Sequence, residues 1–307
     1  MIRIALLAQI VHDNHLSLRN IPPVFLFQII KDETKLARKR VWYRLKIFLK
    51  FYFKRTAKEP VFVVAKRRSG SNLFLSYLNS VPEVTFWPPE PLNWHMHYGI
   101  RKNWVSKKSV FRHLAYTLNS ARTKICGFKV LFFRLKHHGL ALDDFKSHFP
   151  NAKFIILYRK SLLDQFVSLK VAEQTKQWEW TRDFRLPESI RVDVGEFRDF
   201  CRETKEFYEK VRRSPWIRDC ALVLQYEELT SDPQKVFESK VFPFLGLPPR
   251  PVSTSMIKQN TKSMEAIIEN FHEVRPWITE FKFDLSLRGI SRSAVGEESI
   301  HPAQESL

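Results

Sequence analysis

One short polar segment has the composition of an anion-binding loop. It reads Arg67-Arg68-Ser69-Gly70-Ser71-Asn72 and lies between an apolar β-branched run, 61–65, and a segment with helical spacing. At such a turn, backbone N–H groups and the helix dipole attract an anion. Gly70 lets the backbone approach a phosphate, Arg68 supplies a fixed charge, and the Ser and Asn side chains offer donors. The segment predicts a phosphate site, although the Walker A pattern of kinases and NTPases is absent.

A second basic position follows another predicted strand. Arg159 comes directly after the apolar run 154–158, and Ser168 follows nine residues later in a helical stretch. Residues at the carboxyl ends of strands face the crevice where α/β proteins bind ligands. An Arg fork and a Ser hydroxyl can therefore converge there on a second phosphate.

The two segments together resemble the sulfotransferases that use PAPS (3′-phosphoadenosine-5′-phosphosulfate). The family loop typically reads Pro-Arg-Ser-Gly-Ser-Thr-Leu, and this chain has Arg67 for Pro and Asn72 for Thr. The resemblance implies that this loop holds the 5′-phosphosulfate, with Arg68 on the leaving phosphate. It also implies that Arg159 and Ser168 hold the 3′-phosphate. Their nine-residue spacing resembles the bacterial branch that sulfates nodulation signals and trehalose.

A third segment is implied by the same resemblance, which runs from about residue 62 to residue 274. In the family, a basic loop after a short Phe-Leu-Gly turn, here 244–246, covers the nucleotide. Lys258, Gln259 and Thr261 would then contact the 3′-phosphate and the adenosine. A plain surface loop is the alternative interpretation of these three residues.

A general base is needed because an acceptor hydroxyl has a pKa far above neutrality. Glu90 is the candidate, since Pro88, Pro89 and Pro91 around it restrict the backbone. The related bacterial branch has Gly-Glu-Pro-Leu-Asn here, so Pro89 replaces a glycine. Lys129, in the run 125–131, could steer the sulfate or the acceptor. The rival bases are histidines, the base of the cytosolic animal branch: His95, His97, His137 and His138.

The elements that must position these residues alternate along the chain. Strands are predicted at 61–65, 125–131, 154–158 and 221–225, with helical segments at 73–80 and from about 160 to 173. This order predicts an α/β fold with three layers around a mostly parallel sheet, and the resemblance implies a P-loop-like sandwich. We expect one domain over 59–290, a basic appendage over 1–58 and a flexible tail over 291–307.

Composition narrows the class of protein. The chain has 307 residues, 44% of them hydrophobic, which excludes a disordered protein. A net charge of +19 favours anionic ligands without naming one. The three cysteines match no metal motif and favour a reducing compartment, so a cytoplasmic protein is expected.

Segment 34–58 has ten Lys or Arg and no acidic residue, with apolar residues at helical spacing. It predicts a basic amphipathic helix that packs on the domain, contacts an anionic membrane peripherally or contacts a polyanion.

The favoured hypothesis is an enzyme that transfers a sulfuryl group from PAPS to a hydroxyl, leaving PAP, with no metal. The acceptor expected from the branch is a carbohydrate or glycolipid, and no specific nucleic acid is expected. Three alternatives stay open. One is a non-enzymatic basic protein that binds membrane or polyanions, another is an unusual kinase that needs Mg²⁺, and the third is a sulfotransferase-like fold without activity.

Overall fold

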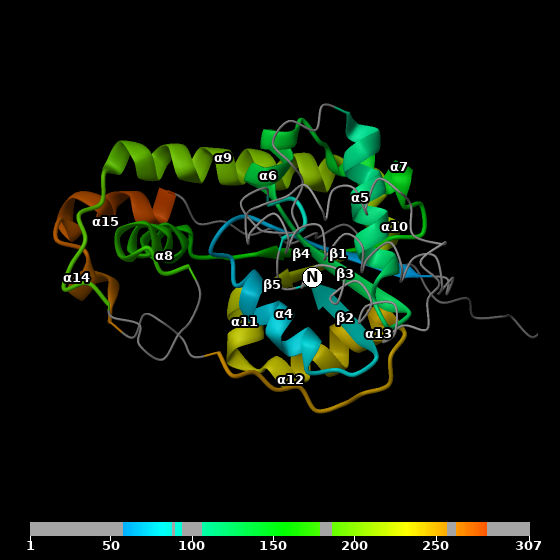
Figure 1. The fold of residues 1–307 in the computed structure, drawn as a ribbon. Coiled ribbons are helices and arrows are strands. Elements are labelled where there is room, and N and C mark those ends of the chain that lie inside the picture. The colour runs from blue at the N-terminus through cyan, green and yellow to red at the C-terminus, as the bar shows by residue number, and fades with distance from the viewer. Residues whose placement is uncertain (1–57, 88–89, 94–105, 179–185, 257–261, 281–307) are drawn as a thin grey trace, which may run out of the picture.

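A parallel sheet forms the centre of the molecule (Figure 1). The computed structural model describes residues 58–87, 90–93, 106–178, 186–256 and 262–280. These residues form a five-stranded sheet in the order β2-β3-β1-β4-β5. The strands are β1 (Glu59–Ala65), β2 (Val84–Trp87), β3 (Ile125–Leu131), β4 (Lys153–Tyr158) and β5 (Ala221–Gln225). Every strand pairing in this sheet is parallel, which refines the expectation of a mostly parallel one.

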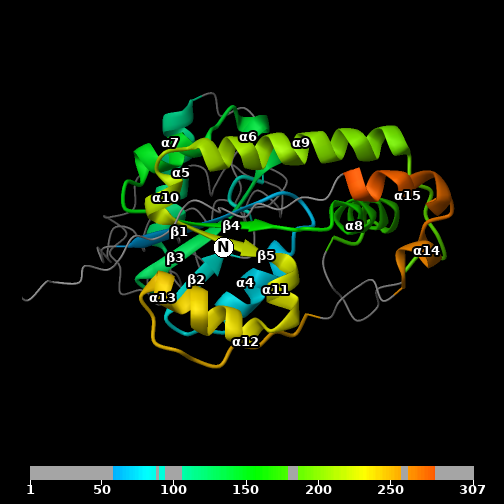
Figure 2. The same ribbon diagram turned by 180° about the vertical axis from the view of Figure 1, so that it is seen from behind.

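Helices connect the strands and cover both faces of the sheet, giving three layers (Figures 1 and 2). One face carries α4 (Ser71–Asn79), α11 (Tyr226–Ser231), α12 (Pro233–Val236), the π-helical turn η2 (Phe237–Val241) and α13 (Phe242–Leu245). The other carries α5 (Lys107–Asn119), α6 (Phe132–His138), α7 (Leu142–His148), α8 (Leu162–Thr175), α9 (Val194–Arg213) and α10 (Ile217–Cys220). Two further helices, α14 (Met264–Ile267) and α15 (Phe271–Glu280), lie beside α8 and α9.

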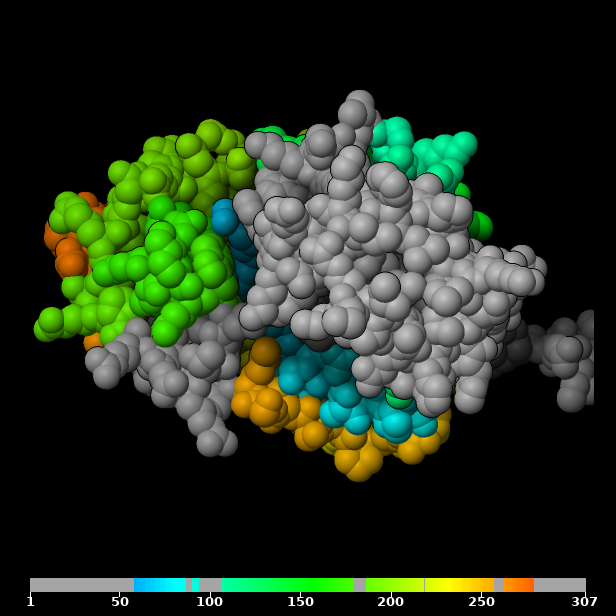
Figure 3. Space-filling model, viewed as in Figure 1, coloured from blue at the N-terminus to red at the C-terminus, as the bar shows by residue number. Residues whose placement is uncertain are grey.

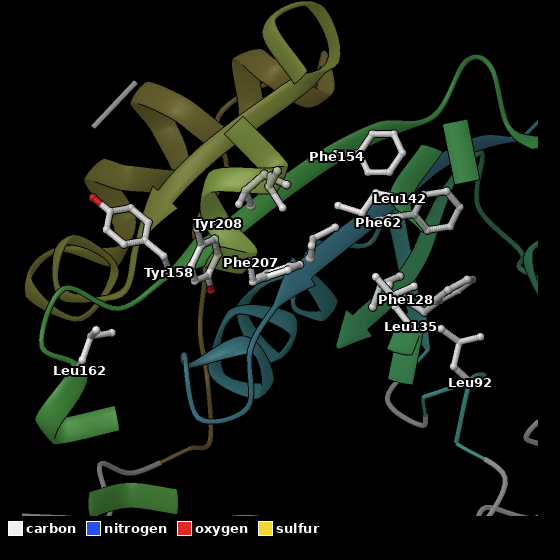
Figure 4. Close-up of a cluster of buried hydrophobic side chains, with 14 of the residues drawn as sticks. Phe62, Leu92, Phe128, Leu135, Leu142, Phe154, Tyr158, Leu162, Phe207 and Tyr208 are labelled. Atoms are coloured by element: carbon white, nitrogen blue, oxygen red, sulfur yellow. The ribbon is translucent and has the colours of Figure 1, made fainter. Parts of the chain in front are cut away.

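Strand β1 shows why the sheet needs a layer on each side. Successive side chains of a strand point to opposite faces. Phe62 and Val64 accordingly join the cluster under α5 to α9, whereas Val61 and Val63 join the cluster under α4 and α11 to α13. All four are fully buried. Figure 4 shows Phe62 among Phe128, Leu142 and Phe154 of the first cluster.

The strand order places a ligand crevice at the carboxyl ends of β1 and β4. The chain runs from β1 to β2 and β3 on one side of β1, and then crosses to β4 and β5 on the other. In such open parallel sheets, ligands bind outside the carboxyl ends of the strands where the order reverses. The loops after Ala65 and Tyr158 flank this point.

Several expectations from the sequence need correction in detail. Strand β2 was not predicted, because only four residues form it. Strand β5 has the predicted bounds and is an edge strand, in which only Leu224 is fully buried. Helix α4 begins at Ser71, two residues earlier than its apolar spacing suggested. The predicted appendage 1–58 except Lys58, and the tail 291–307, lie outside the described residues.

In the space-filling view, the orange segment that ends near residue 256 lies against α4 (Figure 3). The hydroxyls of Ser76 and Thr254 are 2.7 Å apart there, and Ser253 N–H donates to the Ser80 hydroxyl at 3.1 Å. Among the described residues, no helix is both long and apolar enough to cross a membrane.

Candidate functional site

The loop between β1 and α4 has two residues with left-handed backbone. Arg68 has φ of 62° and Gly70, the N-cap of α4, has φ of 86°. A Cβ built on Gly70 would lie 2.2 Å from Cδ2 of Tyr226, so the ring of Tyr226 packs directly on the glycine. Only glycine satisfies both the backbone conformation and this contact. The first turn of α4, with its unpaired N–H groups, therefore begins at a tight turn beside the carboxyl end of β1.

Two buried side chains stabilise the β1–α4 loop by donating hydrogen bonds to its carbonyls. The Ser69 hydroxyl, which is fully buried, donates to the carbonyl of Lys66 at 2.9 Å. Gln165 of α8 is also fully buried, and its Nε2 donates to the carbonyl of Arg67 at 2.7 Å. The sequence suggested that the Ser69 side chain faces the anion, but it is turned inward because it closes this turn. The predicted contribution of Ser69 is thus limited to its backbone.

Arg159, at the end of β4, is held by several weak contacts. Its guanidinium lies over the ring of Tyr226, 4.5 Å from the ring centroid. Its ion pairs are long, at 3.8 Å to Asp164 and 4.0 Å to Glu227. Its Nε is buried and finds no hydrogen-bond acceptor within the described part of the chain. Arg159 is therefore placed beside the loop with hydrogen-bonding capacity that these contacts do not use.

Arg68 joins the two predicted phosphate sites. Its Nε donates to the hydroxyl of Ser168 at 2.9 Å, and its Nη1 donates to the carbonyl of Trp178 at 3.0 Å. Burial, together with the nearby charge of Arg159, lowers the pKa of Arg68 to about 10. Arg68 and Arg159 are both partly buried. Their like charges repel one another, so a bound anion between them would relieve this repulsion. The structure thus brings Arg68, Arg159 and Ser168 together.

Glu90 lies on the other side of the loop, in contact with two cations. Its Oε1 is 3.1 Å from Lys129 Nζ and its Oε2 is 3.4 Å from Arg134 Nε. The Lys129 and Glu90 side chains are 8% and 15% exposed, which makes this a largely buried pair. Lys129 also donates to Oδ1 of Asn72 in the phosphate loop. The candidate base and the loop are therefore joined through one lysine on β3.

The remaining candidates are placed as follows. Arg67 lies over the ring of Phe133, 5.0 Å from its centroid, and is 3.9 Å from Glu173. Of the rival bases, His138 has its Nε2 2.8 Å from the carbonyl of Leu92, and its neighbour His137 lies on the same helix, α6. The other candidates lie outside the described residues, namely His95, His97, Lys258, Gln259 and Thr261.

Three side chains of the site were not assigned a role from the sequence. Arg134 of α6 contacts Glu90, and Tyr226 stands between Gly70 and Arg159. Gln165 supports the loop, and its position inside an apolar helix, next to Phe166 and Val167, was the one signal that could have revealed it. A buried amide on such a face needs a partner, which here is a loop carbonyl.

Nodulation protein H of Rhizobium meliloti is 27% identical over 133 residues, which cover 41% of this chain and 52% of that protein. The chain thus spans about half the length of this curated relative.

Among solved structures, a sulfotransferase from Alicyclobacillus acidocaldarius aligns with a TM-score of 0.47 at 16% identity. That alignment covers 73% of this chain and 93% of that one. A mouse sulfotransferase complexed with PAP aligns with a TM-score of 0.37 at 15% identity, covering 67% and 63% of the two chains. The profile described as the sulfotransferase family matches residues 60–251, more than half of the sequence, and the chain therefore belongs to that family.

Proposed function

We propose that the protein transfers a sulfuryl group from PAPS to the hydroxyl of a carbohydrate or glycolipid acceptor. One observation carries the proposal: Arg68, Arg159 and Ser168 gather beside a glycine-containing strand-to-helix loop at the reversal point of a parallel sheet. A nucleotide with phosphates at both the 3′ and the 5′ position suits two basic sites that share this crevice. Family membership supports the same donor.

The two sides of the loop supply different chemistry. On the β4 side, Arg159 and Ser168 would hold the 3′-phosphate with a charged fork and a hydroxyl. On the β3 side, the first turn of α4, with Ser71 and Asn72, would hold the 5′-phosphosulfate together with Lys129. Preorganised donors and a cation at this end stabilise the negative charge that develops on the leaving phosphate oxygen.

Glu90 is proposed as the general base. The acceptor oxygen attacks sulfur as the bond from sulfur to the 5′-phosphate oxygen breaks, so PAP leaves with that electron pair. The acceptor proton passes to the Glu90 carboxylate. Lys129 and Arg134 hold both carboxylate oxygens, at 3.1 Å and 3.4 Å, which fixes the orientation of the base. No step requires a covalent enzyme intermediate, so positioning supplies much of the rate.

The acceptor class is proposed from sequence similarity. Nodulation protein H is among the relatives, and the spacing from Arg159 to Ser168 resembles the branch that sulfates nodulation signals and trehalose. The basic segment 34–58, which lies outside the described residues except for Lys58, would attach the enzyme peripherally to an anionic membrane. A glycolipid acceptor would be presented at such a surface. We propose a cytoplasmic location because the three cysteines favour a reducing compartment.

A transfer assay tests this function. The full chain is incubated with radiolabelled PAPS and a panel of hydroxylated sugars and glycolipids, with EDTA present in a parallel set. We expect labelled product in both sets, and a KM for PAPS raised about 10- to 100-fold in Arg159→Ala. Arg212→Ala is the matched control, because it removes one arginine from a surface ion pair with Glu209 on α9. Failure to label any acceptor, with no PAP-induced rise in melting temperature, would overturn the proposal.

A further inference from the structure

A groove in the helical layer lies outside the donor site. It has a volume of about 540 Å³ and runs between α6 and α9, beside the start of α7 (Figures 1 and 2). Its floor is apolar: the rings of Phe132 and Phe207 pack with their centroids 4.4 Å apart, and three leucines adjoin them, Leu135, Leu140 and Leu142. This volume lies within the range of sites that bind small molecules.

The rim of this groove carries charges of both signs. Three carboxylates line it, those of Asp143, Glu203 and Glu206, with two ammonium groups, those of Lys136 and Lys210. Among the described residues, no ion pair or hydrogen bond engages the side chains of Glu206, Lys136 or Lys210. These groups therefore keep their hydrogen-bonding capacity for a ligand.

The rim and the floor together indicate the chemical class of that ligand. A small ion of either sign would meet groups of its own charge, because carboxylates and ammonium groups share the rim. A purely apolar ligand would take these groups out of water without giving them hydrogen bonds. A neutral sugar avoids both penalties, since each hydroxyl can donate to a carboxylate and accept from an ammonium group. The C–H faces of its rings can pack on the apolar floor.

One end of the groove adjoins the proposed transfer site. Phe132 is the first residue of α6 and directly follows the carboxyl end of β3. Its ring centroid is 5.7 Å from Nζ of Lys66, the residue after β1, and that Nζ is 3.7 Å from Oε2 of Glu203. Two residues further along α6, Arg134 contacts Glu90. The groove therefore starts at the same edge of the sheet as the proposed base.

From Glu203 the groove follows α9 to Ser214, which precedes the helix that leads into the amino end of β5. This stretch of helix is about 16 Å long at the usual rise per residue. We propose that the α6–α9 groove binds the part of a neutral oligosaccharide acceptor that lies away from the reacting hydroxyl. The inference rests on the proposed function and narrows its acceptor to a saccharide longer than a single sugar ring.

Acceptor length tests this assignment. The full chain is assayed with radiolabelled PAPS and a series of neutral oligosaccharides, from disaccharide to hexasaccharide, of the sugar that the acceptor panel labels best. In the wild type, KM for the acceptor should fall by about tenfold or more from the disaccharide to the hexasaccharide, while kcat changes by less than about threefold. Binding that is equal in the ground state and the transition state changes KM and leaves kcat alone.

Two substitutions alter the groove in different ways. Glu206→Ala deletes a carboxylate from the rim, and Ala141→Trp fills the groove from the exposed start of α7. We expect each to raise KM for the hexasaccharide about tenfold and to leave KM for the disaccharide within about threefold of the wild type. Glu209→Ala is the matched control, because Glu209 lies on the same helix, pairs with Arg212 and does not line the groove.

The outcomes separate this inference from the function on which it rests. If the wild type transfers to the disaccharide and the hexasaccharide with the same KM, the inference is wrong and the function stands. Equal losses with both acceptors in Glu206→Ala and Ala141→Trp also overturn it, as does a wild-type KM for the hexasaccharide in both variants. A wild type that labels no saccharide of any length, and whose melting temperature PAP does not raise, refutes the proposed function itself. Should one variant fail to fold, the other variant and the wild-type length dependence decide.

Discussion

Replacing Glu90 by glutamine should separate catalysis from donor binding. The change removes one negative charge and the proton-accepting group, but keeps the size of the side chain. In the wild type, Glu90 contacts Lys129 and Arg134 at 3.1 Å and 3.4 Å. General-base catalysis contributes about 10²- to 10⁴-fold, so kcat should fall by that factor in Glu90→Gln. This corresponds to about 2.7–5.5 kcal/mol in the activation free energy.

The same substitution has calculable effects on stability and affinity. The pair is largely buried, with Lys129 8% and Glu90 15% exposed. Weakening hydrogen bonds to charged groups lowers the free energy of unfolding by about 1.5–3 kcal/mol. The affinity for the donor nucleotide should not fall with stability. Removing a carboxylate beside Asn72 and Lys129 raises the positive potential that the 5′-phosphate meets. We therefore expect PAP to bind to Glu90→Gln at least as tightly as to the wild type.

Three measurements on one preparation decide the matter: kcat with radiolabelled PAPS, the dissociation constant of PAP and the midpoint of urea unfolding. Glu83→Gln is the control, since Glu83 forms a carboxylate–arginine pair with Arg250 that is more exposed than the Glu90 pair. If Glu90→Gln kept kcat within about threefold of the wild type, Glu90 would not be the base. If it lost PAP binding in parallel with kcat, its role would be to build the donor site.

Three further substitutions test the loop and its surroundings. Gly70→Ala should lower the free energy of unfolding by more than about 2 kcal/mol, measured in urea, because of its left-handed backbone and the Tyr226 ring 2.2 Å from the added Cβ. Gln165→Leu should lower it by about 1–3 kcal/mol and weaken PAP binding by titration, because the Arg67 carbonyl loses its buried donor. Lys66→Met tests the effect of burial, which lowers the pKa of Lys66 to about 8. Between pH 8 and 10.5 the Lys66 amine is protonated in the unfolded chain but not in the folded protein. The free energy of unfolding of the wild type, measured in urea at each pH, should therefore rise with pH over this range relative to that of the variant.

Much of the fold was accessible from the sequence because buried parallel strands carry a strong signal. The run 61–65 is apolar and β-branched, and the structure confirms a strand that is buried on both faces. The strands at 125–131 and 221–225 have the predicted bounds. β2 was not predicted because a strand of four residues is too short to show a clear alternation of apolar and polar residues. Helix α4 begins two residues before the predicted position because its first residues, Ser71 and Asn72, are polar and add nothing to the apolar repeat.

Individual residues of the candidate site could be predicted from the sequence, but the hydrogen bonds between them could not. Loop composition and the position after β4 identified Arg68 and Arg159, since both follow from strand ends. Arg68 bonds Ser168 from a backbone with a left-handed φ angle, which the sequence does not predict for an arginine. The inward turn of Ser69 and the support from Gln165 depend on which carbonyls the folded loop leaves in need of donors. Such partners are set by packing between segments far apart in the chain.

A crystal structure of the full chain with PAP would test the central claim most directly. We predict density for the 5′-phosphate at the first turn of α4 and for the 3′-phosphate between Arg159 and Ser168. PAP bound away from the β1–α4 loop, or crystals grown in saturating PAP that show none at this crevice, would contradict the account.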